Sequence, residues 1–308
     1  MCPPSRSASF LGVFLAMAHV LAVGAHAAEA TPERITLPYW SYPVPQLGSV
    51  ASESPNLGTG CEMRWTWPPY EKAPATHAAA RYCREGLLEG ARAAGDTRTE
   101  ALALAELAVL ELGSEAERER WIERALEVAK GGGDRCVVAF VLRMRQQMER
   151  MLSVMDETLA EAVEWARGGC DAQLASALYE RGIHRVGERG DTGLELLKEA
   201  VSLARRHDYA FVYVHGLESI AYELAERGDP HALDLRREIL DYHRSRGQAQ
   251  EEARATWNVG VAHVHLGDFA SAVPLLERYL QWERDNGRNS FLDREVEYLA
   301  AVRRGFRR

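Results

Sequence analysis

"NVGVAHVHLGDFASAVPLLERYL", residues 258–280, places a Gly-Asp pair between two apolar runs. In each run the apolar residues recur every three or four positions, which is the spacing of an amphipathic helix. Gly267 suits the left-handed conformation that ends a helix, and Asp268 suits the N-cap of the next helix. The segment therefore predicts two antiparallel helices joined by a tight turn, with apolar faces that further helices must cover.

The same hairpin recurs along the chain. Gly-Asp turns return upstream at 228–229 and 190–191. Weaker copies of the second helix occur at 157–169 and 117–133, and their paired first helices are predicted at about 134–152 and 97–112. A nearly constant period is the signature of a solenoid, in which each helix pair packs on its neighbours. The period lengthens only slightly from one repeat to the next. Aligned second helices share one position, which is occupied in turn by Ala125, Ala162, Ala200, Ile239 and Tyr279.

These features resemble the tetratricopeptide repeat (TPR) family over residues 77–290. The chain departs from the family pattern at Thr256, His263 and Tyr279, and its period exceeds the family's usual length of about 34 residues. The longer period and an N-terminal signal peptide are similar to TPR sensor ectodomains of bacterial diguanylate cyclases and related signalling proteins, although their GGDEF module is absent here. The family motif is matched in the last repeat by Val259, Gly260, Gly267, Asp268, Phe269, Ala272 and Leu276, and His263 stands at the position of its tyrosine.

The resemblance implies an all-α fold, an α-solenoid of antiparallel helix pairs (a TPR superhelix) with an irregular N-terminal arm. We expect TPR-like repeats over 77–289. A capping helix with a basic tail should follow at 290–308, because its apolar residues form a single stripe. The preceding segment, 28–76, is rich in proline and aromatic residues and has no helical period, so it predicts the arm.

Residues 1–27 have the features of a secretory signal peptide. One arginine precedes an apolar stretch, and small residues at Ala25 and Ala27 suit cleavage after Ala27. The apolar stretch is shorter than the about 20 residues that a membrane-spanning helix needs. We therefore expect a periplasmic or secreted protein. The remaining chain has 36 basic and 45 acidic residues, a charge that disfavours nucleic acid as a partner.

Four cysteines follow the predicted cleavage site. An even number of cysteines in an exported protein indicates two disulfides, for which three pairings exist. We favour Cys61–Cys83 and Cys136–Cys170, because Cys136 and Cys170 each begin a helix in neighbouring repeats. None of the four has the spacing of a metal site.

The sequence contains no motif for catalysis. It has no nucleophile elbow, HExxH, P-loop or dinucleotide fingerprint, and His263 and His265 point to different sides of a helix. We therefore expect a non-enzyme without cofactor or metal. Its function would be that of a protein or peptide scaffold or sensor.

In TPR proteins, the first helix of each repeat lines a concave groove that holds peptide ligands. The resemblance places tyrosine and tryptophan anchors there, and two glutamates that suit a basic ligand. Trp257 has a second interpretation, as packing between repeats. An alternative function is a regulatory subunit that signals to a membrane partner through the basic tail "VRRGFRR", which predicts at most weak lipid contact. The implied groove residues are Glu180, His184, Glu218, Tyr222, Arg254, Trp257, Val261 and His265.

Overall fold

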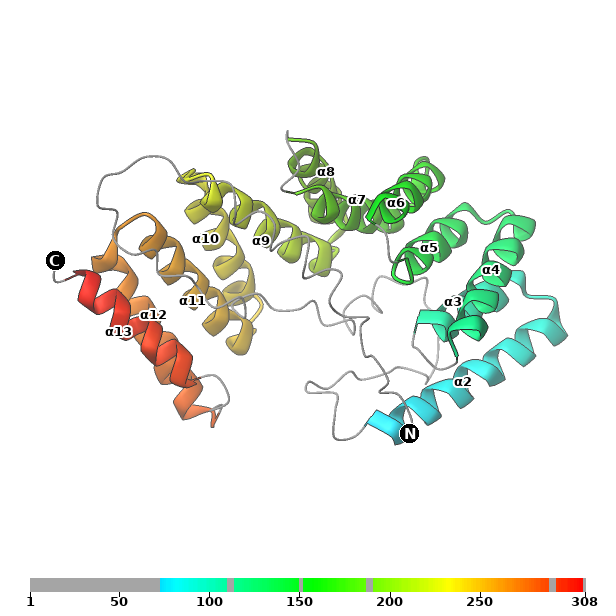
Figure 1. Cartoon of the computed structure of the whole chain (residues 1–308), viewed down its shortest axis with the longest axis horizontal. Helices are drawn as coiled ribbons and strands as arrows, with labels where there is room; N and C mark the ends of the chain where they lie inside the picture. The colour runs from blue at the N-terminus through cyan, green and yellow to red at the C-terminus, as the bar shows by residue number, and fades with distance from the viewer. Residues whose placement is uncertain (1–72, 110–113, 150–151, 187–190, 288–291, 307–308) are drawn as a thin grey trace, which may run out of the picture. The chain divides into compact units, whose positions relative to one another are not determined.

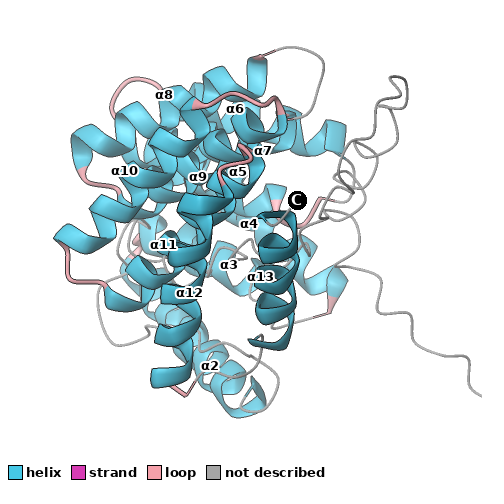
Figure 2. Cartoon of the chain, turned by 90° about the vertical axis from the view of Figure 1, so that its left-hand side faces the viewer, coloured by secondary structure: helices cyan, strands magenta, loops and turns pink. Residues whose placement is uncertain are grey.

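The computed structural model describes residues 73–109, 114–149, 152–186, 191–287 and 292–306. Every regular element in these ranges is an α-helix, and they contain no strand (Figure 2). The predicted all-α class is therefore confirmed. The predicted signal peptide (1–27) and all but the last four residues of the predicted arm (28–76) lie outside the described residues.

The helices pack as consecutive antiparallel pairs, α3 with α4 through α11 with α12 (Figure 1). We refer to α3, α5, α7, α9 and α11 as the first helices and to their partners as the second helices. The helix bounds are α2 (Ala73–Ala94), α3 (Thr97–Val109), α4 (Glu115–Gly132), α5 (Arg135–Gln146), α6 (Leu152–Ala166), α7 (Asp171–Arg185), α8 (Thr192–His207), α9 (Ala210–Glu226), α10 (His231–Ser245), α11 (Ala249–His265), α12 (Phe269–Asp285) and α13 (Leu292–Phe306).

The first helices from α3 to α9 also contact one another directly. Helix α3 packs against α5, α5 against α7, and α7 against α9. We call the surface formed by the five first helices the first-helix wall. A side chain on this wall can therefore meet the side chain at the equivalent position of the neighbouring repeat.

The turn between α11 and α12 has the predicted geometry. Gly267 adopts the left-handed conformation with φ of 73°, and the Asp268 carboxylate accepts the Ser271 backbone N–H at 3.1 Å. The two helices cross closely, because a Cβ on Gly260 would lie 2.9 Å from Cδ2 of Leu276. Ala272 is fully buried at the same crossing, so only small residues fit at both positions.

Two helix boundaries differ from the prediction. Helix α2 begins at Ala73, within the predicted arm, and α5 ends at Gln146 although the pattern suggested a helix to 152. The end of α5 carries no glycine or proline that would mark it in the sequence. Its termination is visible only in backbone bonding, where Gln147 donates its N–H to the Met144 carbonyl at 3.2 Å in a tightened last turn.

Cys136 and Cys170 form a disulfide in the structure, with their Cα atoms 5.3 Å apart. Cys136 lies in the first turn of α5, and Cys170 is the N-cap residue of α7. The bond therefore links the starts of two neighbouring first helices, in agreement with the favoured pairing. The other favoured pair cannot be compared, because Cys61 lies outside the described residues.

The buried residues form two clusters. The larger one extends from α2 to α11, and the smaller one joins α11, α12 and α13. In the smaller cluster, Tyr298, Leu299 and Val302 of α13 pack against the last repeat. Helix α13 therefore covers the end of the stack.

Candidate functional site

The candidate site is the surface of the first-helix wall. Among the described residues, no helix has the length and apolar character to cross a membrane, and no cluster of three or more His, Cys, Asp or Glu is arranged to hold a metal ion. The predicted groove residues all lie on first helices α7, α9 and α11, and the structure places several of them in contacts within the wall.

One position of the first-helix wall carries a charged residue in four successive repeats. We call it the charged register. Its residues are separated by the length of one repeat. The four charged ones are Glu106, Arg143, Glu180 and Glu218, and the fifth repeat has the aromatic residue Trp257 at this position.

Glu180 is neutralised inside the wall. The guanidinium of Arg143, one repeat earlier, donates to both carboxylate oxygens of Glu180, at 2.5 and 3.1 Å, and to Oε1 of Gln173 at 2.9 Å. Arg143 is only 2% exposed, so this is a buried, two-pronged ion pair between α5 and α7. The prediction that Glu180 offers a free charge to a basic ligand is therefore wrong.

His184 is also engaged within the wall. Its Nε2 lies 3.0 Å from Nε2 of Gln146, again one repeat earlier. Burial lowers the pKa of His184, although the charges of Glu180 and Asp156 act in the opposite direction. His184 therefore contributes a second polar link between α5 and α7.

Glu218 faces the interior and is 8% exposed. Its carboxylate lies 2.9 Å from Nδ1 of His215 on the same helix. Burial alone would raise the pKa of Glu218, but the hydrogen bond and charge of His215, together with the charges of Arg236 and Arg254, outweigh it and lower the pKa. Glu218 is therefore not available to a basic ligand, which corrects the second half of that prediction.

Trp257 belongs to the core. Its side chain is 6% exposed, and its ring lies 5.0 Å from Tyr279 and 5.6 Å from Tyr298. These aromatic neighbours come from α12 and from the capping helix α13. Trp257 is therefore a packing residue between helices, which agrees with the second of its two interpretations and not with a role as an exposed anchor.

Glu180 and His184 are half-buried and bonded within the wall, and four further predicted groove residues are also at least partly accessible. Tyr222, Arg254 and Val261 are half-buried, and His265 is exposed. Tyr222 on α9 and Val261 on α11 occupy equivalent positions of successive repeats, while Arg254 forms a loose ion pair with Glu251 at 3.5 Å. We call Tyr222, Arg254, Val261 and His265 the wall patch.

The second helices are joined by a repeated ion pair that the sequence analysis missed. Lys130 of α4 meets Glu161 of α6 at 3.1 Å, and Arg167 meets Glu199 of α8 at 3.7 Å. Arg205 of α8 pairs in the same way with Glu238 of α10. These charges recur with the same period as the second helices. That period in the sequence was therefore the signal that could have predicted the ion pairs. The pattern ends at α12, where Arg278 stands in the place of the glutamate.

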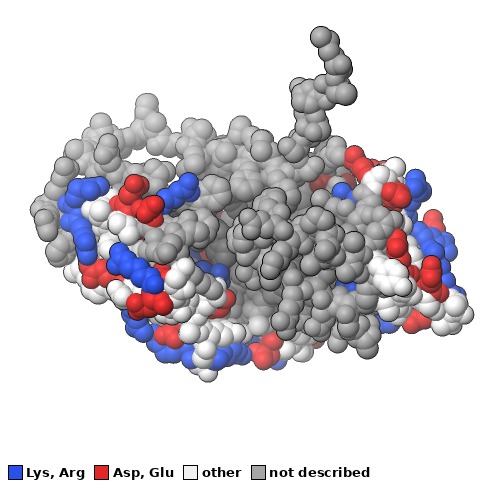
Figure 3. All heavy atoms as spheres, turned by 90° about the horizontal axis from the view of Figure 1, so that it is seen from below, with Lys and Arg blue, Asp and Glu red and all other residues white. Residues whose placement is uncertain are grey.

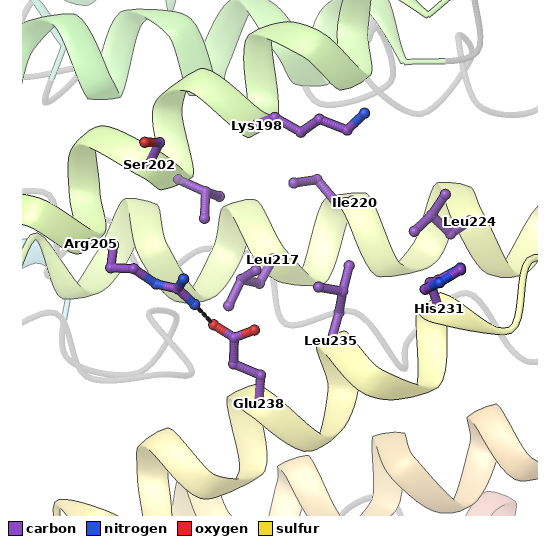
Figure 4. A pocket seen from close by; sticks show the side chains of 10 residues that line it. Lys198, Ser202, Arg205, Leu217, Ile220, Leu224, His231, Leu235 and Glu238 are labelled. Atoms are coloured by element: carbon purple, nitrogen blue, oxygen red, sulfur yellow. Dashed lines mark hydrogen bonds and ion pairs between the residues drawn. The ribbon is translucent and has the colours of Figure 1, made fainter.

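A groove with a volume of about 400 Å³ lies between α8 and α10, with α9 below it. Its floor is apolar and includes Leu217, Ile220 and Leu224. Figure 4 shows the Arg205–Glu238 ion pair bridging its two sides. This groove lies on the side of the second helices. None of the residues predicted to bind a ligand on the first helices lines it.

Charges of opposite sign are intermixed on the described surface seen in Figure 3. Lys and Arg lie beside Asp and Glu rather than forming a separate field of one sign. This distribution agrees with the many cross-repeat ion pairs, such as Arg227 with Asp191 at 2.6 Å and Arg246 with Asp208 at 2.7 Å.

Comparison with known proteins supports the fold. A scan against models of protein families finds no match, and a search of curated proteins finds none either. The chain is similar to the crystal structure of a Signal Transduction ATPase with Numerous Domains (STAND) protein with a tetratricopeptide repeat sensor, from Pyrococcus horikoshii. The TM-score is 0.58 at 15% identity, and the match covers 74% of this chain but only 36% of the other. The chain therefore has the fold of a TPR-like solenoid.

Proposed function

We propose that this protein is an interaction scaffold that binds a protein or peptide partner on the wall patch. The TPR-like fold supports this proposal, because stacked repeats present one extended surface built from equivalent positions. The observation that carries it is a difference between two sets of side chains on the wall. The charged side chains of the register form an ion pair within the wall. In contrast, Tyr222, Val261 and His265 keep accessible surface on α9 and α11.

The composition of the wall patch favours one class of partner. A tyrosine, a valine and a histidine suit aromatic or aliphatic side chains of an extended peptide, and Arg254 suits a nearby carboxylate. A strongly basic peptide is disfavoured, because Glu180 and Glu218 are already paired with Arg143 and His215. The partner would thus be recognised by apolar contact and shape, with charge in a minor role.

Site-specific photocrosslinking in cells tests this proposal. A photoreactive amino acid at His265 should crosslink the partner, whereas the same group at Arg237, exposed on second helix α10, should not. Tyr222→Ala in the His265-labelled chain should reduce the crosslink about tenfold, because a buried interface tyrosine is worth about 1–2 kcal/mol. Equal crosslinking from His265 and Arg237, or an undiminished yield with Tyr222→Ala, would contradict it.

We further propose that the chain is exported, on the basis of the signal-peptide pattern in residues 1–27. A disulfide between Cys136 and Cys170 suits an oxidising compartment. Cell fractionation with thiol labelling tests export, since the exported chain should lack residues 1–27 and have no free thiol at Cys136. The alternative of lipid contact through the tail has less support, because Arg303 is already paired with Glu277 of α12.

A further inference from the structure

Two sets of contacts join neighbouring repeats along the two edges of the stack. On one edge, the first helices pack directly on one another from α3 to α9. On the other edge, ion pairs link successive second helices, and the last of them joins Arg205 of α8 to Glu238 of α10. We call these ion pairs the second-helix ladder. Within the described helices both sets end before α11–α12, so the last junction between repeats differs from the earlier ones.

At the first-helix edge of this junction, α9 and α11 are joined mainly through α10. Helix α10 packs closely against both of them. In the α5–α7 contact, by comparison, Arg143 forms an ion pair with Glu180 at 2.5 Å, and Gln146 lies 3.0 Å from His184. The edge formed by α9 and α11 is therefore held less directly than the edge formed by α5 and α7.

At the second-helix edge, the ladder is interrupted by a change of charge. Arg244 of α10 occupies the position of Arg205, but Arg278 of α12 stands where the ladder needs a carboxylate. Two guanidinium groups repel each other, and both turn to Glu252 of α11 instead. The Oε1 atom of Glu252 lies 3.1 Å from Nε of Arg244 and 3.8 Å from Nη2 of Arg278. The ion pair that joins α8 to α10 thus has no counterpart between the described residues of α10 and α12.

Helix α10 also carries a charged residue at a core position. In the four other second helices this position holds a buried isoleucine or leucine, namely Ile122, Leu159, Leu197 and Leu276. The equivalent residue of α10 is Arg236, which is half-buried. An arginine buries less apolar surface than a leucine, because its charged end must reach water or a partner. The apolar contact with α11 is nevertheless kept, since Ile239 and Val259 belong to one buried cluster.

We propose that the contact between α10 and α11 is a hinge, about which the last repeat and its cap (α11–α13) rotate as one unit relative to α2–α10. The apolar contact holds the two units together, while neither edge of the stack fixes the angle between them. Hinge rotations of packed units occur in microseconds to milliseconds. Between α5 and α7 the disulfide and the Arg143–Glu180 ion pair prevent the same motion.

The hinge regulates the wall patch, because the patch spans it. Tyr222 lies on α9, whereas Arg254, Val261 and His265 lie on α11. Rotation changes the separation of Tyr222 from the other three residues, so a partner that contacts both helices selects one angle. This consequence rests on the proposed function, whereas the hinge in the free chain does not.

Distance distributions measured by electron paramagnetic resonance test the hinge in the full chain without a partner. Spin labels carried by unnatural amino acids leave the native cysteines unchanged. Lys198, Arg237 and Glu277 are exposed and occupy equivalent positions of α8, α10 and α12, so they provide two matched pairs of labels. Labels at 237 and 277, across the hinge, should give a broader distribution than labels at 198 and 237.

Exchange of the ladder charges should exchange the behaviour of the two junctions. Arg278→Glu supplies the missing carboxylate opposite Arg244. It should reduce the fraction of distances outside the main peak of the 237–277 pair about two- to threefold, the factor expected for one exposed ion pair. Glu238→Arg should increase this fraction for the 198–237 pair by a similar factor. Arg206→Glu, the same change of charge at an exposed position of α8 outside the ladder, should alter neither distribution.

Equal widths for the two pairs of labels in the wild type would overturn the proposal, and this comparison requires no charge variant to fold. The proposal would also be overturned if Arg278→Glu left the 237–277 distribution unchanged, or if Arg206→Glu narrowed it equally. Photocrosslinking reports on the proposed function separately. A broad 237–277 distribution without a partner crosslink from His265 would support the hinge and contradict the wall patch.

Discussion

The contact between the α5–α6 and α7–α8 repeats and the contact that closes the stack at α13 are built from different interactions. The first contains a disulfide, a buried Arg143–Glu180 ion pair and a second ion-pair cluster on Asp156. The second is an aromatic cluster centred on Trp257. Arg143 and Trp257 occupy the same position of their repeats. The two contacts therefore differ because neighbouring helices supply different side chains to that position.

A buried charge is tolerated only where a partner arrives with the correct geometry, because an unpaired buried charge costs several kcal/mol. In the middle of the solenoid the next first helix supplies that partner, as Glu180 of α7 does for Arg143 of α5. The last repeat is followed by a single capping helix. An aromatic residue suits this position better, because Tyr279 and Tyr298 can cover Trp257 without a matched charge.

The largest effect is expected at the crossing of α11 and α12. Ala272→Glu places a carboxylate at a fully buried position and should cost more than about 4 kcal/mol. Because repeats contact only their neighbours, α11–α13 should lose protection from hydrogen exchange while α3–α8 remain folded. Ala270→Glu, at an exposed position of the same helix, is the matched control. Loss of protection across the whole chain would show that the two regions do not act separately.

Removal of the disulfide should have the next largest effect, confined to the middle repeats. The bond closes a loop with a sequence separation of 34, so Cys136→Ser with Cys170→Ser should lower stability by about 3–4 kcal/mol in the loop-entropy model. Urea unfolding of both proteins without reductant gives the difference. Identical midpoints would mean that the covalent link does not support this contact.

Asp156 should have a smaller effect that depends on pH. Burial would raise its pKa, but hydrogen bonds from Arg185 and Arg181, at 2.7–3.4 Å, lower it to about 2. The stabilisation is therefore complete above pH 3.8 and is lost as pH falls toward 2. Asp156→Asn should cost about 1–2 kcal/mol at pH 7, after allowance for solvent screening, and the difference should vanish in strong acid. A difference that stays undiminished down to pH 2 would assign the effect to packing.

The smallest effect is expected for the polar contact between α12 and α13. Arg303 and Glu277 form an ion pair whose side chains are about half exposed, so Glu277→Gln should change stability by less than about 0.5 kcal/mol. Thermal unfolding beside the wild type is sufficient to measure this. A loss of about 2 kcal/mol or more, beyond what an exposed ion pair contributes, would mean that charge, and not the aromatic cluster, holds the cap.

The repeat could be predicted from the sequence because its signals are local. Gly267 and Asp268 mark a turn, and the spacing of apolar residues marks the helices on either side. The regular spacing of these helix pairs then predicts that they stack into a solenoid. The end of α5 could not be predicted, because no glycine or proline follows Gln146. The first 72 residues lie outside the described structure, so the predictions made for them remain predictions.

The surface was harder to predict than the fold, because exposure depends on neighbours from other repeats. Glu180 and Glu218 have the composition of a ligand site, yet each is satisfied by a partner in the wall. Applying the repeat period to the first helices would have paired Glu180 with Arg143. The apolar stripe of 290–308 predicts a capping helix, but no periodicity indicates that its Tyr298 packs on Trp257, because this helix lies outside the repeat.

A double-mutant cycle on Arg143 and Glu180 tests most directly whether equivalent positions of successive first helices are in contact. Arg143→Met, Glu180→Met and the double variant are compared with the wild type by urea unfolding. We expect a coupling energy of about 2–3 kcal/mol, with the double variant more stable than Arg143→Met alone, since removing both charges leaves none unpaired. Additive effects within about 0.5 kcal/mol would place the two side chains apart and contradict the stacking of α5 on α7.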